Sequence, residues 1–566
     1  MIKKRIKTLI KKFKEYKIDG YVIPKNDQFF SEYSEENRLK TMTNFSGSAG
    51  YSIILKNKNY LFVDGRYTIQ AQKESANNFK IVNYDKILNC DLFKYLTLGI
   101  DPKIFTYEQI KKFFYKYNKI KIIETNLIDQ IYKKKIKSNK PFFSLKNKIV
   151  GENYKKKIFK IIKYLKKNKS DFLFVTAPEN VAWLLNIRGW DNPNSPIPNC
   201  HLLIDKKKNL YLISKKSKTS KLIREKKLKS SQIIDPKNFK SLISNLKSKK
   251  VIIDKKTCSI FYEDILKKRC KILKKEDPIY SLKSIKNKRE IKNMINAHIF
   301  DGVALTKFIY WIKNINKKKI TEYEAQNKLE FFRKKNKNYL FPSFDTIAGT
   351  AGNSAIVHYR ATKKNTKIIN RKDIFLCDSG GQYKYGTTDV TRTICFSIPK
   401  PKIKNIFTRV LKGHIAVVNS NLSNHTSGRM IDLKARKYLK EINLDYEHGT
   451  GHGVGFFLNV HEGPQAISKF NKINIREGMI LSNEPGYYKK NMFGIRIENL
   501  IYVKKNKNKL CFENLTLAPI DKDLINFDLL TDNEKNYLFR YNLNTYSKLS
   551  KYLTFNEKKW LASFIQ

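Results

Sequence analysis

The amino-acid sequence predicts two α/β domains followed by a larger domain of mixed α/β and α+β character. Its 566 residues exceed the roughly 100–200 residues of an ordinary domain, so we expect about three domains. A helix–strand–loop order recurs in residues 1–140 and 141–280, and the pattern changes near residue 281. We therefore place the third domain at residues 281–566, with a C-terminal extension from about residue 507.

The first predicted domain opens with an amphipathic helix over residues 1–16, where isolated apolar residues lie among lysines at helical spacing. A short apolar strand follows at residues 20–23. The small residues at 44–50 then predict a turn into two strands, at 51–55 and 60–63. This alternation of helix and strand is typical of an α/β domain.

The second predicted domain repeats this order after the polar stretch at residues 133–140. A Lys-rich amphipathic helix at 154–167 precedes a strand at 171–176, and further strands follow at 201–204 and 210–213. We expect two related domains, although their sequences are too dissimilar to prove a duplication.

The third predicted domain begins with two helical segments, at residues 286–313 and 321–334. A strand-rich region then runs from residue 344 to 503, and a loop with two helices closes the chain at 512–566. The first 280 residues hold a single histidine, His201, so we expect the chemistry of the protein late in the chain.

The formal net charge is +64, from 114 Lys and Arg residues against 50 Asp and Glu residues. Such a charge raises the question of a nucleic acid or an anionic membrane as partner. The lysines are spread through all regions beside an excess of Ile and Asn, which suggests an AT-rich coding bias acting on solvated surfaces. No basic helix with interleaved stacking aromatics occurs, so we expect no specific nucleic-acid partner.

Seven cysteines are scattered without any Cys-x-x-Cys spacing, which is typical of a reducing compartment. The N-terminal segment lacks the apolar run of about 7–15 residues and the small-residue cleavage site of a signal peptide. No stretch reaches the ~20 apolar residues of a membrane span. We expect a cytoplasmic protein with no membrane partner.

Four carboxylates lie in apolar, strand-like segments of the third predicted domain: Asp378, Asp389, Glu484 and Glu498. A buried carboxylate is costly unless it is paired or binds a metal, because it loses its hydration. Taken alone, each aspartate is more simply interpreted as a solvated turn or edge residue. Three of the eight histidines, His448, His452 and His461, fall nearby in a Gly-rich segment, which favours a site where backbone and ligand approach closely.

Two aspartates, two glutamates and one histidine offer oxygen-rich ligation without thiolates. Four carboxylates around one site repel one another unless cations are present. Two metal ions roughly 3.5–4 Å apart would relieve this repulsion and share a bridging hydroxide. We therefore expect two divalent metal ions, with Mn²⁺ as the first candidate and Zn²⁺ or Co²⁺ as alternatives.

These segments resemble the aminopeptidase P branch, of the three-domain cytosolic type, of the "pita-bread" metallopeptidases, which also include prolidases and methionine aminopeptidases. The resemblance extends beyond the ligand segments to residues 44–50, 64–67, 183–189, 355–360 and 513–516. It implies two creatinase-like α/β domains before a pita-bread catalytic domain, a homodimer, and an Xaa-Pro aminopeptidase. Such an enzyme releases the N-terminal residue from peptides with proline in second position.

The resemblance also implies a role for each metal ligand. Asp378 would bind one metal ion, His452 and Glu484 the other, and Asp389 and Glu498 would bridge the two. Glu484 would in addition carry the proton from the attacking water to the leaving proline nitrogen, as a carboxylate beside two cations can.

Four further residues receive catalytic roles by the same resemblance. His358 and His461 would line the substrate pocket and hydrogen-bond the scissile carbonyl, with His448 beside them. Arg496, two residues before Glu498, would orient a metal-binding carboxylate. The chain departs from the family pattern at Tyr385, where relatives often carry an acidic residue; we expect altered loop packing there but retained activity.

Two alternatives stay open. A prolidase would use the same five ligands on Xaa-Pro dipeptides, but typically has one preceding domain rather than two. Some proteins with this fold have lost their metals and serve as histone- or RNA-binding modules. The retained ligands and histidines count against that second alternative.

Overall fold

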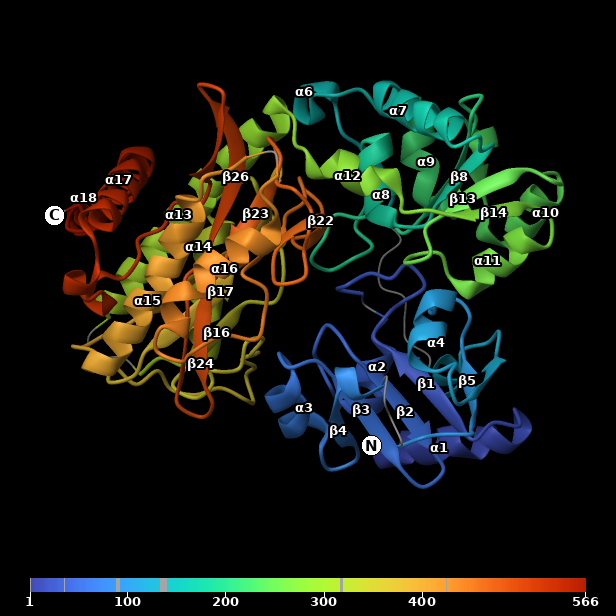
Figure 1. The fold of residues 1–566 in the computed structure, drawn as a ribbon, viewed down its shortest axis with the longest axis horizontal. Coiled ribbons are helices and arrows are strands. Elements are labelled where there is room, and N and C mark those ends of the chain that lie inside the picture. Colours follow the sequence, from blue (N-terminus) through green and yellow to red (C-terminus); the bar gives the residue numbers. More distant parts are fainter. Residues whose placement is uncertain are drawn as a thin grey trace. The chain divides into compact units, whose positions relative to one another are not determined.

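The computed structural model describes residues 2–565 except 35, 88–91, 133–139, 316–318 and 424. The chain divides into two compact units, Met1–Ile279 and Tyr280–Gln566 (Figure 1). The boundary expected between the first two domains, at residues 140 and 141, directly follows residues 133–139, which lie outside the described part of the chain.

The first unit contains a six-stranded sheet in the order β4-β3-β2-β1-β5-β6. Its strands are β1 (Gly20–Pro24), β2 (Tyr51–Leu55), β3 (Asn59–Val63), β4 (Lys80–Asn83), β5 (Thr97–Ile100) and β6 (Lys119–Ile122). Its helices are α1 (Ile2–Glu15), α2 (Arg38–Thr43), α3 (Thr68–Ser75), α4 (Tyr107–Phe113) and α5 (Leu127–Ile131). The apolar stripe of α1, including Leu9 and Phe13, is buried in one core with Tyr21 and Ile23 of β1, as its helical spacing predicts.

A second six-stranded sheet follows in the order β12-β11-β10-β8-β13-β14. Its strands are β8 (Phe172–Val175), β10 (His201–Asp205), β11 (Leu210–Ile213), β12 (Ile233–Ile234), β13 (Lys250–Ile253) and β14 (Lys271–Lys274). The remaining elements of this part are α6 (Asn147–Val150), α7 (Tyr154–Lys167), α8 (Pro178–Leu185), α9 (Lys216–Arg224), α10 (Phe239–Ser244), α11 (Ile260–Lys267) and the strand pair β7 (Phe143–Ser144) and β9 (Ile187–Arg188). Helix α12 (Pro278–Ser284) spans the division between the units.

The two sheets share one topology. In each, one central strand pairs antiparallel with the next strand of that sheet along the chain and parallel with a later one: β1 with β2 and β5, β8 with β10 and β13. The outer strands β4, β6, β12 and β14 are all parallel to their neighbours. This repetition agrees with the predicted fold class of two related α/β regions ahead of the third predicted domain.

The second unit begins with the long helix α13 (Lys288–Asn314) and α14 (Glu322–Lys334), close to the predicted limits. Its strands form two three-stranded sheets, β15-β18-β19 and β16-β17-β20, a five-stranded sheet β22-β21-β23-β26-β27, and the hairpin β24-β25. Their bounds are β15 (Tyr339–Pro342), β16 (Ile347–Thr350), β17 (Phe375–Ser379), β18 (Gly381–Tyr383), β19 (Gly386–Thr387), β20 (Val390–Ile394), β21 (Gly451–Gly453), β22 (Glu462–Ile467), β23 (Ile480–Asn483), β24 (Gly486–Lys489), β25 (Phe493–Arg496), β26 (Asn499–Asn506) and β27 (Lys509–Asn514).

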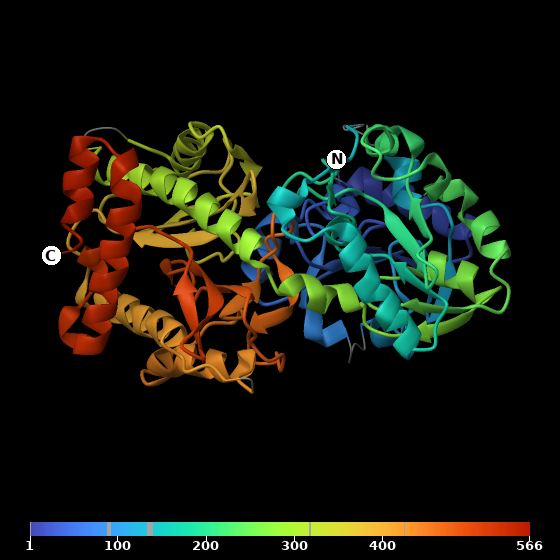
Figure 2. The same ribbon diagram turned by 90° about the horizontal axis from the view of Figure 1, so that it is seen from above.

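The prediction of a strand-rich region over residues 344–503 was incomplete, because two packed helices interrupt it. These are α15 (Pro401–Val418) and α16 (Gly428–Lys440). Buried Ile406, Phe407, Val410 and Leu411 of α15 have the helical spacing that was overlooked. The two predicted closing helices are present as α17 (Asp532–Leu549) and α18 (Phe555–Ala562), which lie beside each other against α13 (Figure 2).

No helix within the described residues is both long and apolar enough to cross a membrane.

Candidate metal centre

The two aspartates come from neighbouring strands of one small sheet. Asp378 lies in β17, and Asp389 directly precedes β20. The antiparallel register of these strands pairs Asp378 with Thr391, which brings the two carboxylates to the same end of the sheet. Both aspartates are buried, at 8% and 4% exposure.

The histidine and the two glutamates come from the five-stranded sheet and from positions next to its strands. His452 is the central residue of β21, Glu484 follows β23, and Glu498 lies between β25 and β26. Strand β21 runs so close to its neighbour that a Cβ at Gly451 would lie 1.9 Å from the carbonyl oxygen of Ser482. The glycines beside His452 therefore have a structural reason: they let the strand enter the sheet and hold the ring at the site.

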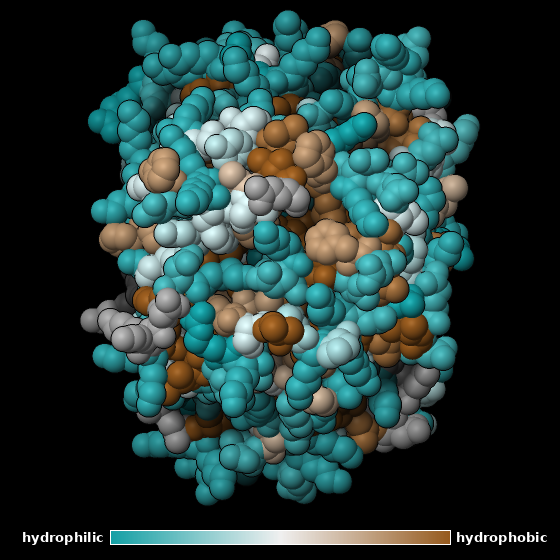
Figure 3. All heavy atoms as spheres, turned by 90° about the vertical axis from the view of Figure 1, so that its left-hand side faces the viewer, coloured by the Kyte–Doolittle hydropathy of each residue, from teal (hydrophilic) through white to brown (hydrophobic). Residues whose placement is uncertain are grey.

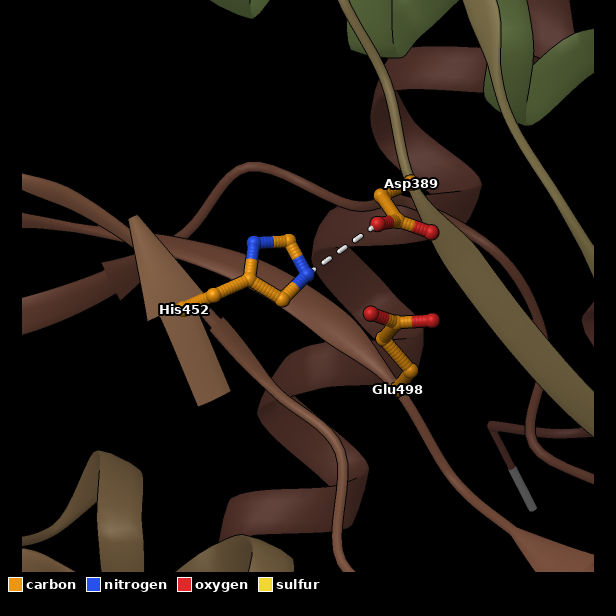
Figure 4. Close-up of side chains that lie close together, drawn as sticks. All are labelled: Asp389, His452 and Glu498. Atoms are coloured by element: carbon orange, nitrogen blue, oxygen red, sulfur yellow. Dashed lines mark ion pairs between the residues drawn. The ribbon is translucent and has the colours of Figure 1, made fainter. Parts of the chain in front are cut away.

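The side chains of Asp389, His452 and Glu498 meet, with one ligand atom of each lying within 4.8 Å of the others (Figure 4). His452 Nε2 is 3.4 Å from Asp389 Oδ2 and 3.6 Å from Glu484 Oε1. The other ring nitrogen, Nδ1, lies 2.9 Å from the carbonyl oxygen of Gly453 and must donate to it. Nε2 is thus left to face the carboxylates, the arrangement expected of a metal-binding histidine.

The carboxylates of the site repel one another. Burial raises the pKa of Glu498 well above its usual range, and Asp389 and Glu484 raise it further. The pKa values of Asp378 and Glu484 are also raised by burial, although Arg496 opposes the shift in both. Burial alone would lower the pKa of His452, but its hydrogen bond to Asp389 and the charge of Glu484 outweigh this and raise it to about 9. Without added cations the site therefore retains protons.

One ligand atom is left without a partner. Asp378 Oδ2 accepts a hydrogen bond from Arg496 Nη2 at 2.7 Å, whereas buried Asp378 Oδ1 has no hydrogen-bond partner among the described residues. A buried carboxylate oxygen in this state costs free energy. A cation at this point would satisfy it, so the donor set fits the two divalent metal ions that the sequence predicts.

Arg496 is held by a network that the sequence did not reveal. Its Nη1 donates to the hydroxyl of Tyr488 at 2.6 Å, and its Nε donates to Thr391 Oγ1 at 3.0 Å. Thr391 Oγ1 in turn donates to Glu498 Oε2 at 2.8 Å. Arg496 and Thr391 therefore orient carboxylates of both sheets. Tyr488 and Thr391 carried no signal in the sequence beyond their nearness to Glu484 and Asp389.

The predicted pocket histidines have different surroundings. The His461 ring contacts the His452 ring edge-on, with centroids 4.3 Å apart. His448 does not join this pair: its Nε2 lies 2.8 Å from the Tyr488 hydroxyl and its Nδ1 2.8 Å from the carbonyl of Gly449. It thereby belongs to the network of Arg496. His358 lies half-buried in the loop between β16 and β17.

Directly after His461, Glu462 anchors the start of β22. Its Oε2 is 3.0 Å from Lys283 Nζ, and its Oε1 contacts Lys286 Nζ. All three side chains are at most 2% exposed. These two ion pairs fix the position of Glu462 and so the backbone next to His461. Tyr385, where the chain departs from the family pattern, packs its ring against Phe457.

Comparison with known proteins identifies the family. The model of metallopeptidase family M24 matches residues 292–505, and that of its C-terminal region matches 508–565. Creatinase/prolidase N-terminal domain models match residues 5–130 and 133–290. The expected creatinase-like and pita-bread regions are thereby confirmed.

Curated relatives match along the whole chain. A probable Xaa-Pro aminopeptidase P of Laccaria bicolor is 35% identical over 97% of this chain and 90% of its own length. Xaa-Pro aminopeptidase 1 of Dictyostelium discoideum is 35% identical over 95% of this chain and 92% of its own length.

Among solved structures, an X-prolyl aminopeptidase from Caenorhabditis elegans, described as a cytosolic enzyme with a di-nuclear active site, has a TM-score of 0.93. It is 28% identical and covers 100% of this chain and 99% of its own. A prolidase from Pyrococcus furiosus has a TM-score of 0.52 at 26% identity and covers only 63% of this chain, but 99% of its own. The matched ranges and the whole-chain relatives show that the chain belongs to metallopeptidase family M24, among its Xaa-Pro aminopeptidases.

Proposed function

We propose that the chain releases the N-terminal residue from peptides with proline in second position, using two divalent metal ions held by Asp378, Asp389, His452, Glu484 and Glu498. The observation that carries this proposal is that Asp389, His452 and Glu498 meet, with Glu484 3.6 Å from His452. Asp378 is close enough to Asp389 for their charges to interact, and its Oδ1 lacks a hydrogen-bond partner among the described residues. The whole-chain relatives supply the substrate class.

In this proposal Asp378 would hold one metal ion and His452 with Glu484 the other, while Asp389 and Glu498 would contribute to both. When bound, the two cations polarise the scissile carbonyl and lower the pKa of water towards neutrality. Four ionised carboxylates repel one another, and two divalent cations carry the four positive charges that would balance them.

The remaining steps fall to the side chains of the chain itself. Glu484, which accepts a hydrogen bond from Ser482 Oγ at 3.1 Å, takes a proton from the attacking water and delivers it to the proline nitrogen. His461 and His358 bind the scissile carbonyl oxygen and stabilise the charge that develops on it. Arg496 holds Asp378 directly through its Nη2, and His448 supports Arg496 through the Tyr488 hydroxyl. Both keep Asp378 in place rather than contact the substrate.

Proline in second position has no N–H and a fixed φ near about −65°, so peptidases that need this donor cannot process the bond. A prolidase remains the nearest alternative, because the Pyrococcus furiosus enzyme shares the fold. A non-catalytic binding module is the second alternative, and the close approach of the ligand side chains argues against it.

The deciding experiment compares three peptides: an Xaa-Pro-Xaa tripeptide, the matched Xaa-Ala-Xaa tripeptide and an Xaa-Pro dipeptide. Each is tested with chelated protein and with protein reloaded with Mn²⁺. We expect metal-dependent release of the first residue from the Xaa-Pro-Xaa tripeptide alone. Activity confined to the dipeptide would instead identify a prolidase.

The metal, the location and the assembly are further parts of the proposal. We propose Mn²⁺ because carboxylate oxygens dominate the ligand set, and the same reloading with Zn²⁺ or Co²⁺ tests it. We propose a cytoplasmic protein, as the Caenorhabditis elegans relative is described to be; imaging of the tagged full chain tests this.

We also propose a homodimer through the C-terminal unit. Figure 3 shows apolar side chains among hydrophilic ones on the face that is on the left in Figure 1. Those exposed on α17 and α18 include Phe539, Leu543 and Phe555, at 48%, 45% and 79% exposure. A second copy would remove them from water. Sedimentation of a monomer at micromolar concentration would contradict this proposal.

A further inference from the structure

A cavity of about 880 Å³ lies within the first unit and contains no residue of the candidate metal centre. Its wall includes the loop after β1, with Asp27 and Phe29, and the segment that leads from β11 into α9. Ligand sites for small molecules typically measure about 300–1,000 Å³, so the cavity has the size of one.

The acidic and the basic side chains around this cavity differ in their partners within the protein. Two acidic residues of the wall have cationic partners: Asp191 is 2.5 Å from Lys218 Nζ, and Glu36 is 3.1 Å from Arg38. The other two, Asp27 and Asp235, accept hydrogen bonds from backbone N–H groups.

Three lysines of the wall, Lys215, Lys216 and Lys237, form no ion pair with any described residue. With Lys103 and Lys218 the wall holds five lysines against four acidic residues, and this excess of positive charge favours an anion.

The start of α9 adds to this preference. The helix begins at Lys216, and its N-cap residue Lys215 provides no capping side chain. The first N–H groups of a helix and its dipole attract negative charge, phosphate groups in particular. Lys215 and Lys216 thus stand where a helix of nine residues already favours an anion.

The cavity wall also contains a buried histidine ring with one free hydrogen-bond acceptor. His201 lines the cavity and is only 3% exposed. Its Nδ1 lies 3.0 Å from the carbonyl oxygen of Thr176 and must donate to that oxygen. Its Nε2 consequently carries a lone pair and has no hydrogen-bond partner within the described residues. Burial lowers the pKa of His201 to about 4, so the ring is neutral near pH 7.

Two further rings adjoin His201 at the cavity. The Phe29 ring centroid is 5.0 Å from that of His201, and the Tyr262 centroid is 4.8 Å from it. Aromatic faces of this kind bind planar rings by stacking, and the free acceptor of His201 can take an amino or hydroxyl hydrogen from the same ring system.

We propose that this cavity binds a nucleoside phosphate, with its phosphates at Lys215, Lys216 and the start of α9, and its base against Phe29 and Tyr262 with a hydrogen bond to His201 Nε2. One part of the wall, with the lysines and the helix N-terminus, matches the phosphates of such a molecule. Another part, with the aromatic rings and the hydrogen-bond acceptor, matches its base. The site is separate from the peptidase chemistry.

The test is binding of ATP to the full chain by titration calorimetry at about 0.15 M salt, where long-range attraction is largely screened. The variant Lys215→Glu/Lys216→Glu removes the phosphate contacts, and we expect at least a tenfold loss of affinity. The matched control, Lys155→Glu/Lys156→Glu, makes the same charge change at two exposed lysines of α7 outside the cavity. An equal loss in the control would overturn the proposal, since the +64 charge alone would then explain binding.

Two more measurements test the ring half of the site. His201→Phe changes no charge near pH 7, so a severalfold loss of ATP affinity in this variant cannot be electrostatic. Tripolyphosphate, which lacks a base, should bind at least tenfold more weakly than ATP. Equal affinity for the two molecules would overturn the proposal. Thermal unfolding and hydrolysis of the Xaa-Pro-Xaa tripeptide, both expected to be unchanged, serve as controls for folding.

Discussion

Two clusters in the second unit place possible metal ligands within 4.8 Å of one another: Asp389 with His452 and Glu498, and Cys395 with Asp521 and Asp523. In the second cluster Lys313 Nζ is 2.7 Å from Asp521 Oδ1 and 2.8 Å from Asp523 Oδ2. A protein cation thus already bridges its two carboxylates and offsets part of their charge.

The first cluster has no such lysine. In the described part of the chain neither Asp389 nor Glu498 forms an ion pair with a lysine or arginine, and Arg496 pairs with Asp378. The difference teaches that proximity of ligand atoms does not by itself define a metal site. What distinguishes one is negative charge that the protein leaves uncompensated.

The variant Asp389→Asn tests the difference between the two clusters most directly. Because this residue is proposed to bridge both ions, we expect tripeptide hydrolysis to fall by about a thousandfold, the equivalent of several kcal/mol of lost transition-state stabilisation. Metal content measured by elemental analysis should fall as well. The paired control is Asp521→Asn in the second cluster, which should leave metal content unchanged. Retention of two metal equivalents by Asp389→Asn would refute the ligand assignment.

A smaller loss is expected from Arg496→Lys. A lysine can contact Asp378 but cannot also reach Tyr488 and Thr391, so the carboxylate is less well oriented. Partners of metal ligands typically contribute about 10–100-fold to activity or metal affinity. We expect kcat to fall within that range while KM changes little. A change in KM alone would show that Arg496 contacts the substrate.

Removal of the lysine should make the second cluster resemble the first. In Lys313→Met the carboxylates of Asp521 and Asp523 lose their cation, which we expect to cost about 2 kcal/mol of stability because the pair is largely buried. Urea unfolding measures this loss. Added Mn²⁺ should raise the unfolding temperature of this variant more than that of a control such as Lys307→Met. An equal response would mean that charge balance does not separate the two clusters.

The pH dependence of stability should also differ between chelated and metal-loaded protein. The pKa of Glu498 is raised above its ordinary 4.5 and that of His452 is raised from 6.5 to about 9, so the folded, metal-free state holds protons that the unfolded chain releases. Stability of the chelated protein should therefore decrease as pH rises from about 4.5 to 9. Bound cations replace these protons. Equal pH profiles of the unfolding temperature with and without metal would contradict this.

The sequence predicted the ligand types and their order but not the network that holds them. Asp378 and Glu498 were identifiable because a carboxylate in an apolar strand is unusual. Thr391 and Tyr488 were not, because hydroxyl residues are common in strands and their partners depend on how β17, β20 and β24 come together.

The fold, too, was predicted from the sequence only in part. Amphipathic α1 and α7 and strands β1, β2 and β3 were predicted closely, since their hydrophobic periodicity is clear, whereas β4, β5 and β6 were not predicted. Helices α15 and α16 were overlooked within a stretch interpreted from its flanking strands. The shared topology of the two N-terminal sheets depends on the pairing of distant strands, which local sequence does not specify.

The buried pair of lysines on Glu462 bears on how the chain can be shortened. Lys283 and Lys286 precede residue 292, where the match to the metallopeptidase family model begins. A catalytic fragment cut at that residue would leave Glu462 buried without either cation, one position from His461. A fragment that begins before Lys283 would keep both. The functional limit of the peptidase unit therefore lies upstream of the one that family matching suggests.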